Sequence, residues 1–331
     1  MKKISVLLTF SFFMVVFTFN GKIFSQSSGY KVVGKIVIGG ESRWDYLSID
    51  TVMHRLYVSH MSQVEIIDLN KGTVIGVIPN LKGVHGIAFA QEFNKGFISN
   101  GKDNSVTVFN LKTMKVTANV KVPAKGPDAI VYDPFSKRVF SFNENSDNAT
   151  AIDAKTNKVV GNVALDGGPE FAVSNQNGKM FVNIEDKNMI EEFDPKTLKK
   201  VNVWSILPCK SPSALAIDLK TGLLFSGCRN KLIAVVDSKS GKLVTSLPIG
   251  AGVDADRFDP VDNLVFVSCG EGVLTVIKEN SPEDIKVIDN ITTTKGARTM
   301  AFDKSADRIY LSAMVNGNDN KAQFGVLILA K

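Results

Sequence analysis

Behind an apolar leader, the chain alternates short runs of β-branched, aromatic and aliphatic residues with turns rich in Asp, Asn, Pro, Gly and Lys. Apolar runs of four to eight residues that are bounded by turn-forming residues predict β-strands joined in hairpins. No stretch of ten or more residues behind the leader has the 3.6-residue periodicity of an amphipathic helix. The pattern therefore predicts an all-β fold.

One segment recurs seven times, at intervals of about 42 residues. Each copy contains a β run, a polar turn and a second β run: "SIDTVMHRLYVSH" (48–60), "AFAQEFNKGFISN" (88–100), "VYDPFSKRVFSFN" (131–143), "VSNQNGKMFVNI" (173–184), "AIDLKTGLLFSGC" (216–228), "RFDPVDNLVFVSC" (257–269) and "AFDKSADRIYLSA" (301–313). A second hairpin follows most copies, as in "ATAIDAKTNKVVGNV" at 149–163. Seven units of four strands each predict a seven-bladed β-propeller.

The two ends of the chain share one repeat between them. The last unit begins at Ala297 and ends after its third strand, "FGVLILAK" at 324–331. An unmatched fourth strand, "KVVGKIVIGG" at 31–40, precedes the first unit. We predict that this N-terminal strand completes the last blade and closes the ring, because closure removes an exposed strand edge.

Several segments carry a resemblance to a known family: "LYVSH", "GFISN", "VTVFN", "AIDAKTNKVV", "KGVHGIAFA" and "KGPDAIVYD". They resemble the repeat of the YVTN β-propellers, which include the YncE-like periplasmic proteins. The resemblance extends from about Tyr30 to Lys331, although no copy contains the literal YVTN tetrad and the sixth is irregular after Val276. It implies a propeller of a family that is defined by architecture more than by one activity.

The N-terminus has the pattern of a secretory signal peptide. Lys2 and Lys3 precede an uncharged run at 4–19, which is shorter than the ~20 residues that a membrane-spanning helix needs. We therefore predict a signal peptide at 1–25 and a single propeller domain at 26–331, secreted or periplasmic, with no membrane span after cleavage. An uncleaved anchor is the alternative interpretation.

Composition restricts the expected partners. The formal net charge is +6, but Lys2, Lys3 and Lys22 belong to the leader, and no long Lys/Arg run is present. Nucleic acid is therefore an improbable partner, and we expect a monomer that recognises a protein, a glycan or a small molecule. The three cysteines leave at least one thiol unpaired within the chain. A Cys209–Cys228 bridge and separate inert thiols both remain open.

One position in each repeat, at the start of the innermost strand, should lie at the mouth of the central channel. The equivalent residues are Asp45, His85, Asp128, Glu170, Ser213, Asp254 and Arg298. We predict that the ionisable members form a ligand-binding site, namely Asp45, His85, Asp128, Glu170, Asp254 and Arg298. The alternative is that these residues are polar only because strand ends at a channel mouth are solvated.

The signs of these charges suggest what the mouth binds. Arg298 should serve Asp254 and Asp45, whereas Asp128 and Glu170 have no built-in cationic partner except His85 near Asp128. We expect a divalent cation or a cationic ligand group there, with Asp128 and Glu170 as the first metal ligands, and no other cofactor. Further rim residues should come from neighbouring loops: His60, Asn100, Asp103, Asn143, Glu144, Glu185, Asp186, Arg229 and Glu271.

Two other residues near the channel have two interpretations each. Arg257 stands where other repeats have small residues. It is expected to form a structural ion pair with Asp254 or Asp256, or else to contact an anion in the channel. Trp44, at the start of the first blade, either stacks on a ligand or packs against the adjacent loop.

The sequence favours a non-enzymatic binding protein. It lacks the G-x-S-x-G, H-E-x-x-H, C-x-x-C-H and P-loop motifs, and it contains only three histidines. The alternative is a metal-dependent lactonase-type hydrolase or a lyase that uses the carboxylates and His85 of the mouth. A propeller associated with haem or a quinone is a third, weaker hypothesis. The fold alone cannot choose among these functions.

Overall fold

The computed structural model describes residues 27–40, 44–317 and 321–331. The expected signal peptide at 1–25 lies outside these residues and stays a prediction. Within the described ranges, no helix is long and apolar enough to cross a membrane.

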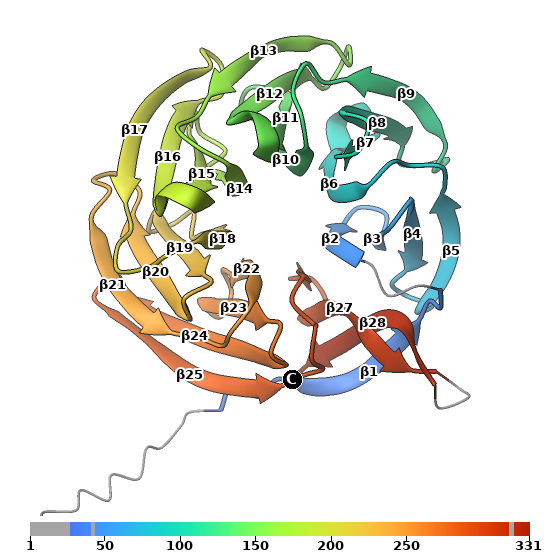
Figure 1. Ribbon diagram of the computed structural model, residues 1–331. Coiled ribbons are helices and arrows are strands. Elements are labelled where there is room, and N and C mark those ends of the chain that lie inside the picture. Colours follow the sequence, from blue (N-terminus) through green and yellow to red (C-terminus); the bar gives the residue numbers. More distant parts are fainter. Residues whose placement is uncertain (1–26, 41–43, 318–320) are drawn as a thin grey trace, which may run out of the picture.

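The strands form seven four-stranded sheets arranged as blades around a central axis (Figure 1). Neighbouring strands of a blade run antiparallel wherever their register is defined. This was expected, because short polar turns can join only antiparallel strands. The described part of the chain also contains three short 3₁₀ turns, η1 (Gln91–Phe93), η2 (Glu144–Ser146) and η3 (Glu185–Lys187). The predicted all-β, seven-bladed propeller is confirmed.

The four strands of each blade lie side by side, in order from the channel outward. Blade 1 contains β2 (Trp44–Asp50), β3 (Arg55–His60), β4 (Gln63–Asp68) and β5 (Thr73–Ile78), and blade 2 contains β6 (Val84–Ala90), β7 (Lys95–Asn100), β8 (Ser105–Asn110) and β9 (Val116–Lys121). Blade 3 contains β10 (Pro127–Asp133), β11 (Arg138–Asn143), β12 (Asn148–Asp153) and β13 (Val159–Ala164), and blade 4 contains β14 (Pro169–Ser174), β15 (Met180–Ile184), β16 (Met189–Asp194) and β17 (Lys199–Ser205). The remaining strands are β18 (Pro212–Ile217), β19 (Leu223–Cys228), β20 (Leu232–Asp237) and β21 (Leu243–Pro248) in blade 5; β22 (Val253–Asp259), β23 (Leu264–Cys269), β24 (Val273–Ser281) and β25 (Asp284–Thr292) in blade 6; and β26 (Met300–Asp303), β27 (Arg308–Asn316), β28 (Ala322–Ala330) and β1 (Lys31–Val37) in blade 7.

The N-terminal strand closes the ring as predicted. β1 runs antiparallel to β28, in a register that pairs Lys31 with Ala330 and Val37 with Gly325. In Figure 1 the blue β1 lies along the outer edge of the red C-terminal blade. The edge of β28 that would otherwise be open is therefore paired, which removes a site for aggregation.

Packing holds the closing strand in place. Ile36 is buried in a cluster with Phe324 and Val326 of its own blade and Leu47 of blade 1. Gly325, which is paired with Val37, has no room for a side chain, because a Cβ there would lie 2.3 Å from the carbonyl oxygen of Ile36. Tyr30, just before β1, packs its ring edge-on at 4.9 Å against Phe266 of blade 6. The closing segment thus contacts blades 1, 6 and 7.

Apolar side chains fill the spaces between neighbouring blades. Between blades 3 and 4, for example, Phe140 and Phe193 lie with ring centres 5.4 Å apart in a cluster that also contains Met180 and Val182. Burial of such large side chains is the main favourable contribution to folding. Because each blade is packed on both sides, the starts of the inner strands are held in fixed positions around the channel.

The sixth repeat departs from the pattern only in its outer hairpin. β24 and β25 each have nine residues and are joined by a tight turn after Ser281. The outer strands of most other blades have six residues. The irregularity after Val276 therefore reflects a longer hairpin, and blade 6 keeps four strands.

The ring closure predicts a difference between two positions on β1. Ile36→Ala should lower the free energy of unfolding by about 3 kcal/mol, because it leaves a cavity in the cluster that joins blade 7 to blade 1. Val32→Ala, on the same strand but 43% exposed, should cost about 0.5 kcal/mol or less. Equilibrium urea unfolding measures both values, and equal losses would mean that β1 does not hold the ring together.

Candidate functional site

The inner strands are irregular at the positions that were predicted to form the site. In blade 1, Trp44 is opposite His60, but the next regular pair is Leu47 with Val58, so that Asp45 and Tyr46 lie in a bulge. Register shifts of this kind flank the corresponding residues of the next three blades, His85, Asp128 and Glu170. A bulge turns a side chain away from the direction that regular pleating gives it. The repeated bulge places these side chains at the start of the channel.

Serine side chains of preceding blades fix the backbone at three of the positions. The hydroxyl of Ser59 donates a hydrogen bond to the carbonyl of His85, that of Ser99 to the carbonyl of Asp128, and that of Ser268 to the carbonyl of Arg298. These positioning residues were not among the predicted site residues. Their signal is a serine at the fourth position of the motifs "LYVSH" (56–60), "GFISN" (96–100) and "VFVSC" (265–269).

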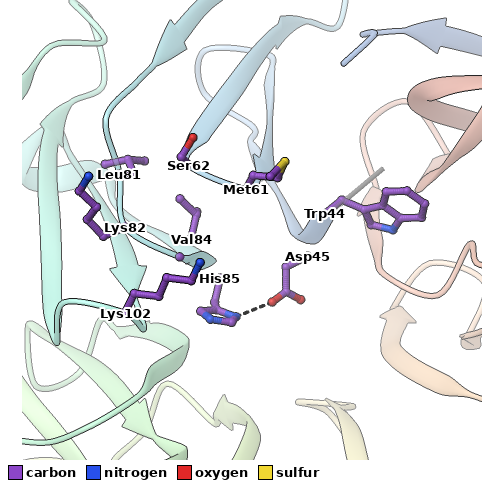
Figure 2. Close-up of a pocket in the computed structure, with 10 residues that line it drawn as sticks. Trp44, Asp45, Met61, Ser62, Leu81, Lys82, Val84, His85 and Lys102 are labelled. Carbon is purple, nitrogen blue, oxygen red and sulfur yellow. Dashed lines mark hydrogen bonds and ion pairs between the residues drawn. The ribbon is translucent and has the colours of Figure 1, made fainter. Parts of the chain in front are cut away.

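His85 lies between two carboxylates from neighbouring blades. Its Nδ1 atom is 2.6 Å from Oδ2 of Asp45 and 3.1 Å from Oδ1 of Asp128. Figure 2 shows the ring of His85 directed at Asp45. The donor atoms of the three residues all lie within 4.8 Å of one another, close enough to hold one metal ion. The triad of Asp45, His85 and Asp128 is therefore the most compact group of the predicted site.

The triad retains a proton at neutral pH. Burial lowers the pKa of His85, but its hydrogen bonds to Asp128 and Asp45 outweigh burial and raise the pKa to about 10. Burial raises the pKa of Asp45 above its usual value, although its hydrogen bond with His85 lowers it. The imidazolium consequently neutralises part of the negative charge on blades 1 to 3.

Glu170 does not join the triad. The guanidinium of Arg229 lies 3.6 Å from Oε1 of Glu170 and 2.9 Å from Oε1 of Glu185. The expectation that Glu170 lacks a built-in cation was therefore wrong, because the loop after β19 brings Arg229 over blade 4. Burial and a hydrogen bond with Glu185 raise the pKa of Glu170 to about 10. Asp128 and Glu170 were the expected first metal ligands. Among the described residues, the group that could hold a metal ion is instead Asp45, His85 and Asp128, so that Asp128 belongs to it and Glu170 does not.

The other side of the mouth contains a simple ion pair. Nε of Arg298 is 3.1 Å from Oδ2 of Asp254, as the sequence predicted. Burial raises the pKa of Asp254 to about 7, although the charge of Arg298 lowers it. Ser213 is the equivalent residue of blade 5. Its hydroxyl donates a hydrogen bond to the carbonyl of Val253 in blade 6, at 2.9 Å. Ser213 is buried and therefore contributes little to the mouth.

The rim around these residues is divided by charge. A cavity of about 410 Å³ between blades 1 and 2 is lined by Lys82 and Lys102 together with Asp45 and His85 (Figure 2). A second cavity of about 410 Å³ beside blades 3 and 4 is lined by acids, namely Glu144, Asp147, Glu185 and Asp186. A cationic group that approaches the mouth would be attracted to the side of blades 3 and 4.

Two other expected rim residues have structural contacts. The ring of Trp44 stacks on Phe324 of blade 7 at 5.2 Å, which agrees with packing against a neighbour, and Trp44 also lines the cavity between blades 1 and 2. His60 is buried, and its Nδ1 lies 3.2 Å from Oε1 of Glu65. Hydrogen bonds from His60 and Gln63 outweigh burial and lower the pKa of Glu65. These residues support blade 1 beneath the rim.

Two of the cysteines end strands next to the mouth, since Cys228 directly precedes Arg229 and Cys269 ends β23. Cys209, Cys228 and Cys269 are buried, free thiols. Burial raises the pKa of Cys269 to about 12, which keeps its thiol protonated and unreactive at neutral pH. The expected alternative of a Cys209–Cys228 bridge is not formed in this structure.

Comparisons with known proteins place the fold but not a family. No family model matches the chain. Antigen Lp49 of Leptospira interrogans is 25% identical over 284 residues, which cover 75% of this chain and 59% of that protein, so the chain spans less than two thirds of its relative. A solved structure of U3-55K has a TM-score of 0.77 and 8% sequence identity, and the match covers 91% of this chain and 98% of that one. At this identity the second likeness shows the propeller fold alone.

The triad predicts an unusual titration of His85. Because its pKa is raised from 6.5 to about 10, its ring should stay protonated between pH 6 and 8. The two ion pairs should stabilise the fold fully below pH 6.5, and this stabilisation should be lost as the pH rises through 10. NMR detection of the histidine ring protons measures the titration.

A double variant supplies the control for this titration. Asp45→Asn with Asp128→Asn removes both carboxylates but leaves the ring partly buried, so the pKa of His85 should fall by several units. If wild-type His85 titrates near pH 6.5, or if the double variant leaves its titration unchanged, the triad is not formed in solution.

Proposed function

We propose that this chain is an exported, YncE-like binding propeller that recognises a partner protein, a glycan or a small ligand through a cationic group at the channel mouth. The observation that carries the proposal is the gathering of carboxyl groups around the channel mouth. The carboxyl groups are Asp45, Asp128, Glu144, Glu170, Glu185 and Asp254, and they outnumber the cationic groups His85, Arg229 and Arg298 at the mouth together with Lys82 and Lys102 on its rim.

The pKa values indicate that these acids repel one another. Asp128 contributes to the raised pKa of both Glu144 and Glu170, after burial has made the larger contribution. A bound cation would relieve this repulsion without requiring the carboxyl groups to take up protons. A cationic ligand group therefore complements the mouth better than an anion, which also disfavours nucleic acid as a partner.

Export and a binding role are supported by separate observations. The leader at 1–25 has the features of a signal peptide. The similar Leptospira protein is named an antigen, which agrees with an exported protein that contacts other molecules. The YVTN-like repeats point to the same class of protein. None of these observations identifies the partner, so the chemistry of the mouth defines the first probes.

A metal-dependent hydrolase or lyase is the second candidate, and the triad is the observation that favours it. Asp45, His85 and Asp128 offer one nitrogen and two carboxylates at one point. Such a donor set fits Zn²⁺ or a similar transition metal, which would have to displace the proton of His85. A bound metal would then supply an activated water for hydrolysis.

The proposal predicts that binding depends on the acids of blades 3 and 4. Putrescine serves as a cationic organic probe and Zn²⁺ as a metal probe, each titrated into the mature protein by isothermal calorimetry. Asp128→Asn with Glu170→Gln should weaken putrescine binding at least tenfold and leave the protein folded, with a small loss of stability because Asp128 gives up its ion pair with His85. Glu92→Gln is the matched control, since Glu92 pairs with Lys137 at 2.8 Å in the turn at the other end of the inner strand.

The two candidate functions predict different results for the binding of putrescine and Zn²⁺. Putrescine binding without stoichiometric Zn²⁺ supports the binding protein. Zn²⁺ that copurifies in a 1:1 ratio by elemental analysis, and that is lost in His85→Gln, supports the metal enzyme. Equal binding of both probes by the wild-type protein and the double variant would contradict a site at this mouth.

A further inference from the structure

Another cavity opens at the other end of the channel and differs in chemistry from the acidic mouth. It has a volume of about 470 Å³ and is formed by the later parts of the inner strands. Most of its lining is apolar, including the rings Phe89, Tyr132, Phe171, Phe258 and Phe302. Cavities of this size with apolar walls and few polar groups are typical of small-molecule sites.

Arg257 is the cationic side chain of this cavity. Its Nη1 atom donates a hydrogen bond to the carbonyl of Asp256 at 2.7 Å, and its guanidinium lies 4.9 Å from the centre of the Phe171 ring. Among the described residues, no carboxylate lies within 4.0 Å of it, and Asp254 is instead paired with Arg298. The expectation of a structural ion pair for Arg257 was therefore wrong, and the alternative of an anion contact remains.

Asp256, the only acid among the described residues that line the cavity, does not cancel this charge. Its side chain is fully buried, and its Oδ2 accepts a hydrogen bond from the backbone N–H of Gly227 at 2.7 Å. Burial raises the pKa of Asp256 to about 8, so the carboxyl is mostly neutral at pH 7. Arg257 consequently presents a positive charge to a mostly apolar space, whose other polar lining residues are neutral.

The cavity is separated from the acidic mouth by side chains in the middle of the channel. Tyr46 and Phe171 lie with ring centres 5.4 Å apart, and both line a small void together with Arg257. The carboxyl groups of the mouth lie beyond Tyr46, whose pKa they raise further after burial. A ligand with two negative charges would be repelled by these groups and would meet one arginine only.

We propose that this cavity binds a monocarboxylate with an apolar alkyl or aromatic body. The carboxylate pairs with Arg257, whose planar guanidinium matches two carboxylate oxygens, and the apolar body lies against the rings of the wall. This site is independent of the proposed function of the mouth, because it uses other residues at the other end of the channel.

The test uses octanoate as the probe, with two ligands of equal chain length as controls. In calorimetric titrations of the mature protein at pH 7, octanoate should bind at one site, 1-octanol at least tenfold more weakly, and octylamine not at all. Arg257→Gln should weaken octanoate binding at least tenfold. Arg138→Gln should leave it unchanged, since Arg138 donates to the carbonyls of Pro195 and Lys196 and does not line the cavity.

A spectroscopic measurement keeps the proposal testable if Arg257→Gln does not fold. Nuclear Overhauser contacts from the octanoate methyl group to the rings of Phe89 or Phe258 are expected in the wild-type protein. The proposal is overturned if octanoate does not bind, if 1-octanol binds as tightly as octanoate, if folded Arg257→Gln binds octanoate normally, or if the contacts arise from another part of the surface.

Discussion

The pairing of β1 with β28 is the interaction on which the rest of the structure depends. It ties the first described strand to the last and lets seven blades pack in a closed ring. In a closed ring, equivalent residues of successive blades face a common axis. The channel mouth therefore gathers charges that are about 40 residues apart in the sequence, such as Asp45, His85 and Asp128. The Asp45–His85–Asp128 triad is a consequence of closure together with a repeated bulge, and connecting segments add Arg229, Glu144 and Glu185.

The same inner strands give the channel two different ends. At their starts, bulges turn ionisable side chains inward, and ion pairs with His85, Arg229 and Arg298 offset part of the repulsion. Further along, regular pleating turns apolar side chains inward, and the rings of Tyr46 and Phe171 separate the two regions. A propeller of this kind can present one face to a cationic group and the other to an apolar acid.

Much of the fold could be predicted from the sequence, because repeats and turn residues report backbone structure directly. The split seventh repeat predicted the pairing of β1 with β28, and repeat spacing located the strand starts. The partners of individual side chains could not be predicted in the same way. The spacing fixes where Glu170 and Ser213 begin, but not that a loop brings Arg229 to Glu170 or that Ser213 bonds sideways to Val253. Arg257 likewise lacks the expected ion pair, because the carboxyl group of its neighbour Asp256 accepts a hydrogen bond from the backbone N–H of Gly227. Such details depend on local bulges and on contacts between blades.

The central claim is that ring closure and the formation of the channel mouth are one cooperative event. Hydrogen exchange measured by mass spectrometry over a series of urea concentrations tests it most directly. The account predicts that peptides covering β1, β28 and the inner strands β2, β6 and β10 lose protection together at the same urea concentration. If β1 exchanges at low urea while the inner strands of the mouth stay protected, the terminal strand is a dispensable edge and the account is contradicted.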